Sequence, residues 1–180
     1  MAYKKTRRRL VVTFTVLLLS VIVVAAGAFV LKQMAESRTV ISQQILDQAD
    51  FIIFYPGDTT KLDTVWQLQK DRTSYDKESG VLTLHALQAS TGRQVVLNEQ
   101  PTPGAFADVP TQYSRMLNTL NEYDELQIGF GTVALTRPKE LNGGQSAVAN
   151  KAGTLIFAKP SVNFTNEEWR DFFDSLRILR

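Results

Sequence analysis

An unbroken apolar run near the start of the chain most restricts how this 180-residue protein can fold. Residues 10–31 read LVVTFTVLLLSVIVVAAGAFVL and contain no charged side chain. As a helix rising about 1.5 Å per residue, this run is roughly 33 Å long, enough to cross a hydrocarbon core of about 30 Å. The run therefore predicts a transmembrane helix that binds the lipid bilayer.

A block of basic residues sets the orientation of this helix. Lys4, Lys5, Arg7, Arg8 and Arg9 precede the apolar run, and residues 1–9 contain no acidic side chain. Positive charges next to a membrane helix are retained in the cytoplasm. We expect a single-pass protein of the cell membrane with residues 1–9 cytoplasmic and everything after residue 31 extracytoplasmic.

Two other interpretations of the apolar run stay open. Ala26, Gly27 and Ala28 form an A-x-A site at which a secretory signal is cut after Ala28, although the run continues to Leu31 and exceeds the 7 to 15 residues of a typical signal core. A type IV pilin-like helix also follows basic residues. Such proteins place Gly before the processed Phe and Glu five residues further on, and neither is present here.

Charge and cysteine content narrow the function classes. Without the five N-terminal positive charges, the rest of the chain has 15 basic and 18 acidic residues and is mildly acidic. Nucleic-acid binding is not expected, because it depends on Lys and Arg neutralising phosphates. The absence of cysteine excludes disulfides, thiolate metal sites, a cysteine nucleophile and a lipid-modified cysteine.

Residues 32–49 contain few helix breakers and are interpreted either as a helical stalk that continues the membrane helix or as a polar linker. From residue 50 the apolar pattern changes to period two. Short runs separated by turn-type clusters predict antiparallel strands at 51–55, 64–69, 81–88, 94–100, 125–137, 145–151 and 153–160. Residues 101–110 are expected to form a loop.

Two amphipathic helices are predicted. Tyr113, Met116, Leu117 and Leu120 follow helical spacing after Pro110. In the second, Thr165 and Glu168 have capping-box spacing. Its apolar stripe comprises Trp169, Phe172, Phe173, Leu176 and Leu179. The expected fold class is α+β: residues 50–180 form an antiparallel sheet of about six strands with two helices packed on one face.

Short motifs in this order resemble a group of bacterial proteins: Tyr55-Pro56, NEQPTP at 98–103, Gly131-Thr132-Val133, Lys159-Pro160 and the final NEEW…DSL helix. These are single-pass membrane proteins with one extracytoplasmic domain, akin to anti-sigma-factor and lipoprotein-carrier-like regulators. The resemblance implies a domain of the cell envelope that binds or senses and carries no catalytic residues.

No catalytic, cofactor or metal-ligating constellation is predicted from the residues. His85 is expected to be a cross-strand surface histidine, because the neighbouring sequence offers it no catalytic or metal partners. Two acidic groups are interpreted as solvated turns or connectors rather than as a calcium loop or a carboxylate pair: Asp71, Asp76 and Glu78, and Glu122, Asp124 and Glu125.

Two further candidates are also given structural interpretations. Asn163-Phe164-Thr165 matches a glycosylation sequon, but Thr165 is already assigned to the helix cap. Five aromatic residues that could line a lipid or peptide pocket are expected to be core or interface residues instead: Phe51, Phe54, Tyr55, Phe106 and Phe130.

The favoured hypothesis is a non-enzymatic, membrane-anchored domain that binds a protein or another envelope component. A pilin-like subunit of a surface appendage is the first alternative. An anchored hydrolase that uses carboxylates near Asp76 or Asp124 is the second.

We expect mass spectrometry of the protein purified from its membrane to find residues 10–31 in the mature chain, because the apolar run is long enough to span the bilayer. A mature N-terminus at Phe29 would instead identify residues 1–28 as a cleaved signal. Processing within residues 4–12, with recovery in sheared filaments, would favour the appendage subunit.

Overall fold

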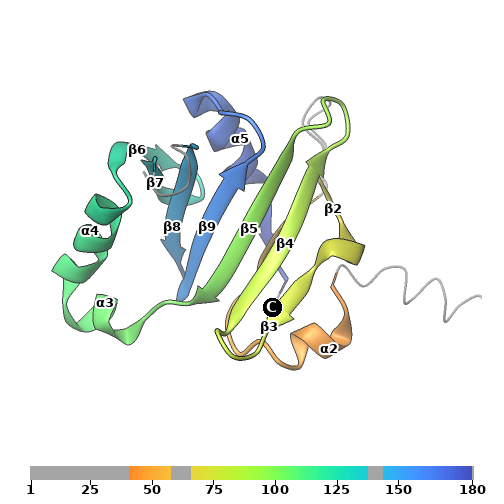
Figure 1. Ribbon diagram of the computed structural model, residues 1–180, viewed down its shortest axis with the longest axis horizontal. Coiled ribbons are helices and arrows are strands. Elements are labelled where there is room, and N and C mark those ends of the chain that lie inside the picture. Colours follow the sequence, from red (N-terminus) through yellow and green to blue (C-terminus); the bar gives the residue numbers. More distant parts are fainter. Residues whose placement is uncertain (1–40, 58–65, 138–143, 180) are drawn as a thin grey trace, which may run out of the picture. The chain divides into compact units, whose positions relative to one another are not determined.

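An antiparallel sheet of eight strands forms the centre of the computed structural model, which describes residues 41–57, 66–137 and 144–179 (Figure 1). These residues belong to one unit, spanning 41–180. The predicted cytoplasmic segment, the predicted membrane helix and residues 32–40 of the stalk or linker lie outside the described residues. Within the described ranges, no helix has the length and apolar character that crossing a membrane requires.

The order of strands across the main sheet is β2-β4-β5-β9-β8-β7-β6, and β3 pairs with β4 on the same edge as β2. Their bounds are β2 (Trp66–Leu68), β3 (Ser74–Asp76), β4 (Val81–Gln88), β5 (Gln94–Pro101), β6 (Glu122–Ile128), β7 (Gly131–Thr136), β8 (Ser146–Lys151) and β9 (Thr154–Pro160). A second, two-stranded sheet joins β1 (Phe54–Pro56) to β10 (Leu176–Ile178). The expected α+β class with antiparallel pairing is confirmed.

The expectation of about six strands was too low, for two reasons. The short strand β3 lies in a polar stretch without the alternation that marked its neighbours. In addition, residues 122–136 form two strands, because β6 and β7 make a hairpin around Gly129 and Phe130. Gly131 closes that turn at φ 137°, a backbone conformation that other residues rarely adopt.

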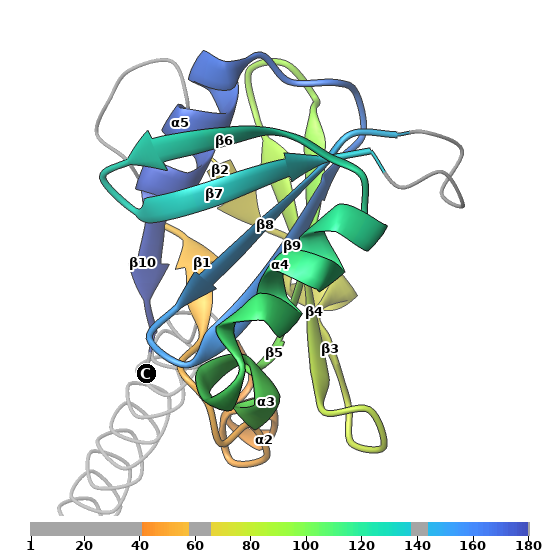
Figure 2. The ribbon, with the colours of Figure 1, turned by 90° about the vertical axis from the view of Figure 1, so that its left-hand side faces the viewer.

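Strand periodicity gives the sheet two different faces. The first face carries fully buried residues of the central strands, such as Leu84, Leu97 and Ile156. Helix α5 (Asn166–Ser175) and strand β1 lie over this face (Figure 2). The second face carries the alternate residues, including His85, Val96 and Phe157, which are only half-buried.

Helix α5 begins as predicted and ends earlier than predicted. Thr165 accepts the Glu168 N–H at 3.2 Å, and Glu168 accepts the Thr165 N–H at 2.8 Å, which completes the capping box. The helix stops at Ser175 because residues 176–178 pair with β1 as strand β10. Leu176 and Leu179 therefore do not continue the helical stripe.

The aromatic face of α5 fills the core over the first face. Trp169, Phe172 and Phe173 are fully buried and contact one another with ring centroids 5.6 to 6.3 Å apart. Phe172 also meets Trp66 edge-on at 5.0 Å, and Phe173 lies 5.4 Å from Phe130. One helix thus joins side chains from β2 and from the β6–β7 turn.

Helices α3 (Gly104–Asp108) and α4 (Pro110–Thr119) lie on the second face, opposite α5 (Figure 2). Leu117 of α4 packs on Ala134, Val148 and Leu155 from β7, β8 and β9. The prediction that both helices pack on one face was therefore wrong. Each helix has an apolar stripe, and the two stripes pack on opposite faces of the sheet. Residues 101–110, expected as a loop, contain the short helix α3.

Residues 41–49 contain one short helix, α2 (Gln43–Leu46). Ile41 and Ala49, which flank it, are only 2% and 1% exposed. These two side chains belong to the core of the unit that spans 41–180.

We expect Phe172→Ala to lower the free energy of unfolding by about 3 to 5 kcal/mol, because it leaves a cavity among Trp66, Trp169 and Phe173. Arg170→Ala, at an exposed position of the same helix, is the control and should change it little. Urea denaturation of both variants measures the difference. Equal stabilities would contradict the central packing role of α5.

Candidate ligand-binding face

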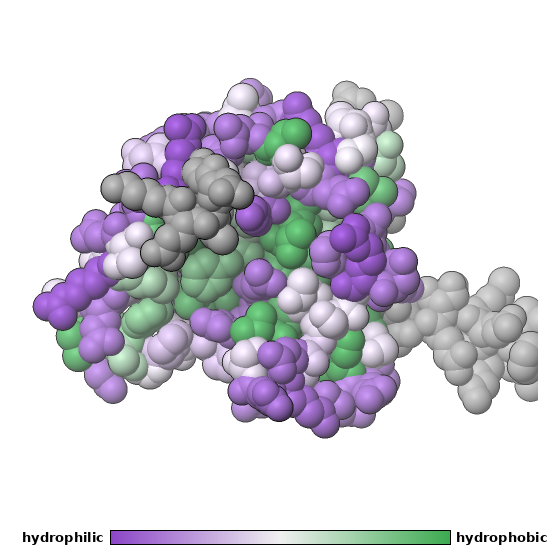
Figure 3. All heavy atoms as spheres, viewed as in Figure 1, coloured by the Kyte–Doolittle hydropathy of each residue, from purple (hydrophilic) through white to green (hydrophobic). Residues whose placement is uncertain are grey.

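Part of the second face is not covered by any α-helix of the described residues. Helices α3 and α4 cover β7, β8 and part of β9, whereas β4 and β5 run across the front with no described α-helix over them (Figure 1). The space-filling view shows this area as a hollow between two flanks (Figure 3). We call this area the open half. Its side chains, from β4, β5 and β9, are those of Thr83, His85, Val96, Asn98, Gln100, Phe157 and Lys159.

A shallow pocket of about 340 Å³ occupies the lower part of the open half. Its floor is one cross-strand row, in which Ser74 pairs with Thr83, Thr83 with Asn98, and Asn98 with Phe157. Side chains opposite one another in antiparallel strands lie roughly 5 Å apart and so form a continuous surface. The described lining residues are Ser74, Asp76, Ser79, Val81, Thr83, Asn98, Gln100 and Phe157. The pocket is thus mainly hydroxyl and amide in character.

Asp76 supplies the one charged side chain among the described lining residues. Its carboxylate accepts the Ser79 hydroxyl at 2.6 Å and the Glu78 N–H at 3.0 Å. These hydrogen bonds, the Ser79 bond most of all, lower the pKa of Asp76. Asp76 is therefore ionised at neutral pH and also fixes the β3–β4 turn that forms one wall of the pocket.

His85 lies on the predicted polar side of β4, at the upper part of the open half. It is half-buried rather than fully exposed, and its Nδ1 atom is shielded without a hydrogen-bond partner among the described residues. Burial, and then the positive charge of Arg72, lower the pKa of His85. Its ring is consequently neutral at pH 7 and adds no positive charge to the face.

A buried carboxyl group lies on β5, on the face of the sheet opposite the pocket. Glu99 is fully buried, and its Oε2 accepts the Phe54 N–H at 3.1 Å, while Oε1 has no partner among the described residues. Burial raises the pKa of Glu99 to about 8, partly offset by the Phe54 N–H. The group is therefore mainly protonated at pH 7 and holds β1 against the main sheet as a neutral acid.

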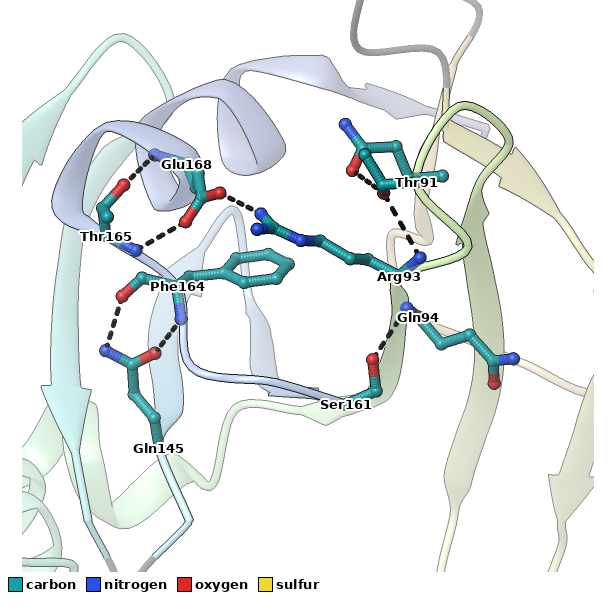
Figure 4. Close-up of polar contacts among 9 residues, drawn as sticks. Thr91, Arg93, Gln94, Gln145, Ser161, Phe164, Thr165 and Glu168 are labelled. Atoms are coloured by element: carbon teal, nitrogen blue, oxygen red, sulfur yellow. Dashed lines mark hydrogen bonds and ion pairs between the residues drawn. The ribbon is translucent and has the colours of Figure 1, made fainter.

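A polar cluster at the upper edge of the molecule connects the β4–β5 turn to the start of α5 (Figure 4). Arg93 forms an ion pair with Glu168 and lies 5.9 Å from the centroid of the Phe164 ring. Gln145 donates to the Phe164 carbonyl at 3.1 Å and accepts its N–H at 2.7 Å. Because these groups pair with one another, the cluster has a structural role and is a poor candidate for ligand binding.

The two acidic groups singled out in the sequence are separated by the fold. Asp76 lies at the β3 edge of the main sheet and Asp124 at the β6 edge, so their carboxylates do not form a pair. Asp124 instead accepts from Asn166 at 2.9 Å. Within the described ranges, no group of three or more His, Asp and Glu side chains is placed to hold a metal ion.

Glu122 and Glu125 lie near Tyr113 of α4. Burial, and then the charge of Glu125, raise the pKa of Glu122. Burial, followed by the two carboxylates, raises the pKa of Tyr113 to about 12. The predicted polar connector is in fact strand β6, and these side chains contribute to the flank formed by α4.

The aromatic candidates do not gather into one pocket. Phe51, Phe54 and Phe130 are buried core residues, and the rings of Phe54 and Phe130 lie 5.2 Å apart over the first face. Phe106 packs on Tyr113 at 5.5 Å on the other face, and Tyr55 is half-buried in β1. Their interpretation as core or interface residues is confirmed for the three buried side chains.

The residues that line the pocket were not singled out in the sequence. Asn98, Gln100 and Thr83 occupy the polar positions of alternating strands, which normally face solvent. Glu99 could have been noticed, because it shares an apolar strand face with Val95 and Leu97. A carboxyl group at such a position signals an unusual environment.

Comparisons with protein-family models, with curated proteins and with solved structures give no match for this chain. The geometry of the open half is therefore the basis on which a function can be proposed.

We expect the stability of the protein to fall as the pH rises from about 4.5 to about 8. In this interval the unfolded chain releases the Glu99 proton and the folded chain keeps it, since the pKa is raised on folding. The loss of stability over this interval is on the order of several kcal/mol, and Glu99→Gln should remove much of it. Urea denaturation at pH 5 and pH 8.5 measures the effect.

Glu167→Gln, at an exposed position of α5, is the control for removing a carboxylate. If the wild type and Glu99→Gln lost equal stability between the two pH values, this result would show that Glu99 does not stay protonated in the folded protein.

Proposed function

We propose that this protein is a membrane-anchored, extracytoplasmic binding domain that contacts a protein or another envelope component without catalysis. Residues 10–31 hold it in the cell membrane, with residues 1–9 in the cytoplasm and residues 50–180 outside. The open half of the second face is the contact surface. The single observation that carries this proposal is that no α-helix of the described residues covers this half of the face.

The division between the two faces supports this assignment. The first face is closed by α5 and β1, and its side chains are almost fully buried. On the second face, α4 packs on β7, β8 and β9, and within the described ranges no α-helix covers the strands β4 and β5. A hollow with mixed polar and apolar lining on a rigid sheet is suited to binding, because the paired strands hold its side chains in place.

The charge of the protein favours an envelope component over a polyanion as its partner. The chain after residue 9 is mildly acidic, and Asp76 adds a negative charge to the pocket. Positive charge at the open half comes from Lys159, which is exposed on β9, and from Arg72, which donates to Gln94 of β5. Two cations provide little affinity for a phosphate backbone.

We expect a photoreactive amino acid at position 159 to form crosslinks in intact cells, because this position lies on the open half. The matched control is position 170, where Arg170 is exposed on α5, the helix of the opposite face. Adducts that form at position 159 and not at position 170, identified by mass spectrometry, would support the proposal. Equal adduct patterns, or none at position 159, would contradict it.

A further inference from the structure

We propose that the pocket on the open half binds a neutral, hydroxyl-rich ligand, namely a saccharide unit of the cell envelope. This inference rests on the proposed function and specifies its ligand class. It follows from the hydrogen-bonding groups of the pocket, from its charge and from the way its strands are paired.

The pocket presents neutral hydrogen-bonding groups that are not satisfied within the described structure. Thr83 donates to Asn98 Oδ1 at 2.9 Å, which leaves the Asn98 amide nitrogen free to donate to a ligand. The Gln100 amide makes no hydrogen bond with the described residues, and a side-chain amide offers two donors and one acceptor oxygen. Neighbouring amides and hydroxyls of this kind match ligands that both donate and accept, as sugar hydroxyls do.

Size and apolar lining agree with this ligand class. A volume of about 340 Å³ is at the small end of the range for ligand sites and is enough for one or two sugar rings. Phe157 and Val81 provide the apolar part of the lining. A pyranose ring has one face of C–H groups, which can pack against Phe157 while its hydroxyls reach the amides of β5.

The charge of the pocket disfavours anionic ligands. The described lining residues include no Lys, Arg or His, and Asp76 is held ionised by Ser79 and Glu78. A phosphate or a carboxylate would be repelled by Asp76 and would find no cation to pair with. Lipid headgroup phosphates and nucleic acids are therefore poor fits for this pocket.

Strand pairing and lining polarity disfavour a peptide and a lipid chain. Extended peptides commonly add to a free strand edge, yet β4 and β5 under the pocket are paired on both sides. The edge strand at the wall of the pocket, β3, is only three residues long and offers little backbone for pairing. A lipid chain needs a continuous apolar lining, whereas six of the eight described lining residues are polar. The remaining class with matching chemistry is the neutral saccharide.

The test uses the full chain in phospholipid nanodiscs, because alkyl glycoside detergents would themselves compete as saccharides. Maltotetraose, mannotetraose and chitotetraose are the probes, and saturation-transfer NMR and calorimetry measure binding. We expect at least one probe to bind in the micromolar to millimolar range. Asn98→Ala and Gln100→Ala should each weaken binding about tenfold through lost hydrogen bonds.

Gln94→Ala is the matched control, since Gln94 lies on the same strand and the same face but outside the pocket. Thermal unfolding of the three variants separates lost binding from lost folding. Weakening by Asn98→Ala and Gln100→Ala, with Gln94→Ala unchanged, would support the inference. Binding that all three variants weaken equally, or that none of them weakens, would overturn it.

The saccharide proposal and the proposed function can fail separately. If none of the three tetrasaccharides binds at millimolar concentration while position 159 still crosslinks in cells, the ligand class is overturned and the binding face stands. If a saccharide binds and depends on Gln100 while position 159 gives no adduct, the ligand class is supported and the proposed contact of the open half with an envelope partner in cells is contradicted.

Discussion

The aromatic face of α5 is the contact on which the rest of the molecule depends. Trp169, Phe172 and Phe173 bury their rings against one face of the main sheet and bring Trp66 and Phe130 into the same core. The chain then leaves the helix at Ser175 and pairs with β1, which closes this face from the side. Because α5 and β1 already cover the first face, α3 and α4 pack on the second face, and they cover only part of it.

That incomplete cover connects the fold to the proposed function. An antiparallel sheet can keep one face in water, so the open half needs no partner for the domain to be stable. Its strands are nevertheless interior strands, paired on both sides, and the side chains of Thr83, Asn98 and Phe157 stand in a fixed row. A preformed polar row of this kind binds a ligand without first having to become ordered, which lowers the entropic cost of binding.

Local patterns predicted the elements better than their arrangement. Period two located β4, β5, β8 and β9, and the spacing of Thr165 and Glu168 located the start of α5, because these signals arise from neighbouring residues. The end of α5, the separation of β6 from β7 and the placement of the helices on opposite faces depend on long-range pairing. The pocket was missed for the same reason, since an outward-facing Asn98 or Gln100 looks the same in sequence whether or not a helix covers it.

The sequence by itself determined the antiparallel α+β class, the cap of α5 and the expectation of a membrane helix at residues 10–31, each from the chemistry of a contiguous stretch. Only the tertiary structure decided which half of the second face the described helices leave open and that Glu99 lies in the core as a neutral acid. The physical reason is that burial is a property of the assembled chain. Glu99 owes its raised pKa to its burial, which outweighs the opposing effect of the hydrogen bond from the Phe54 N–H, 45 residues away in sequence.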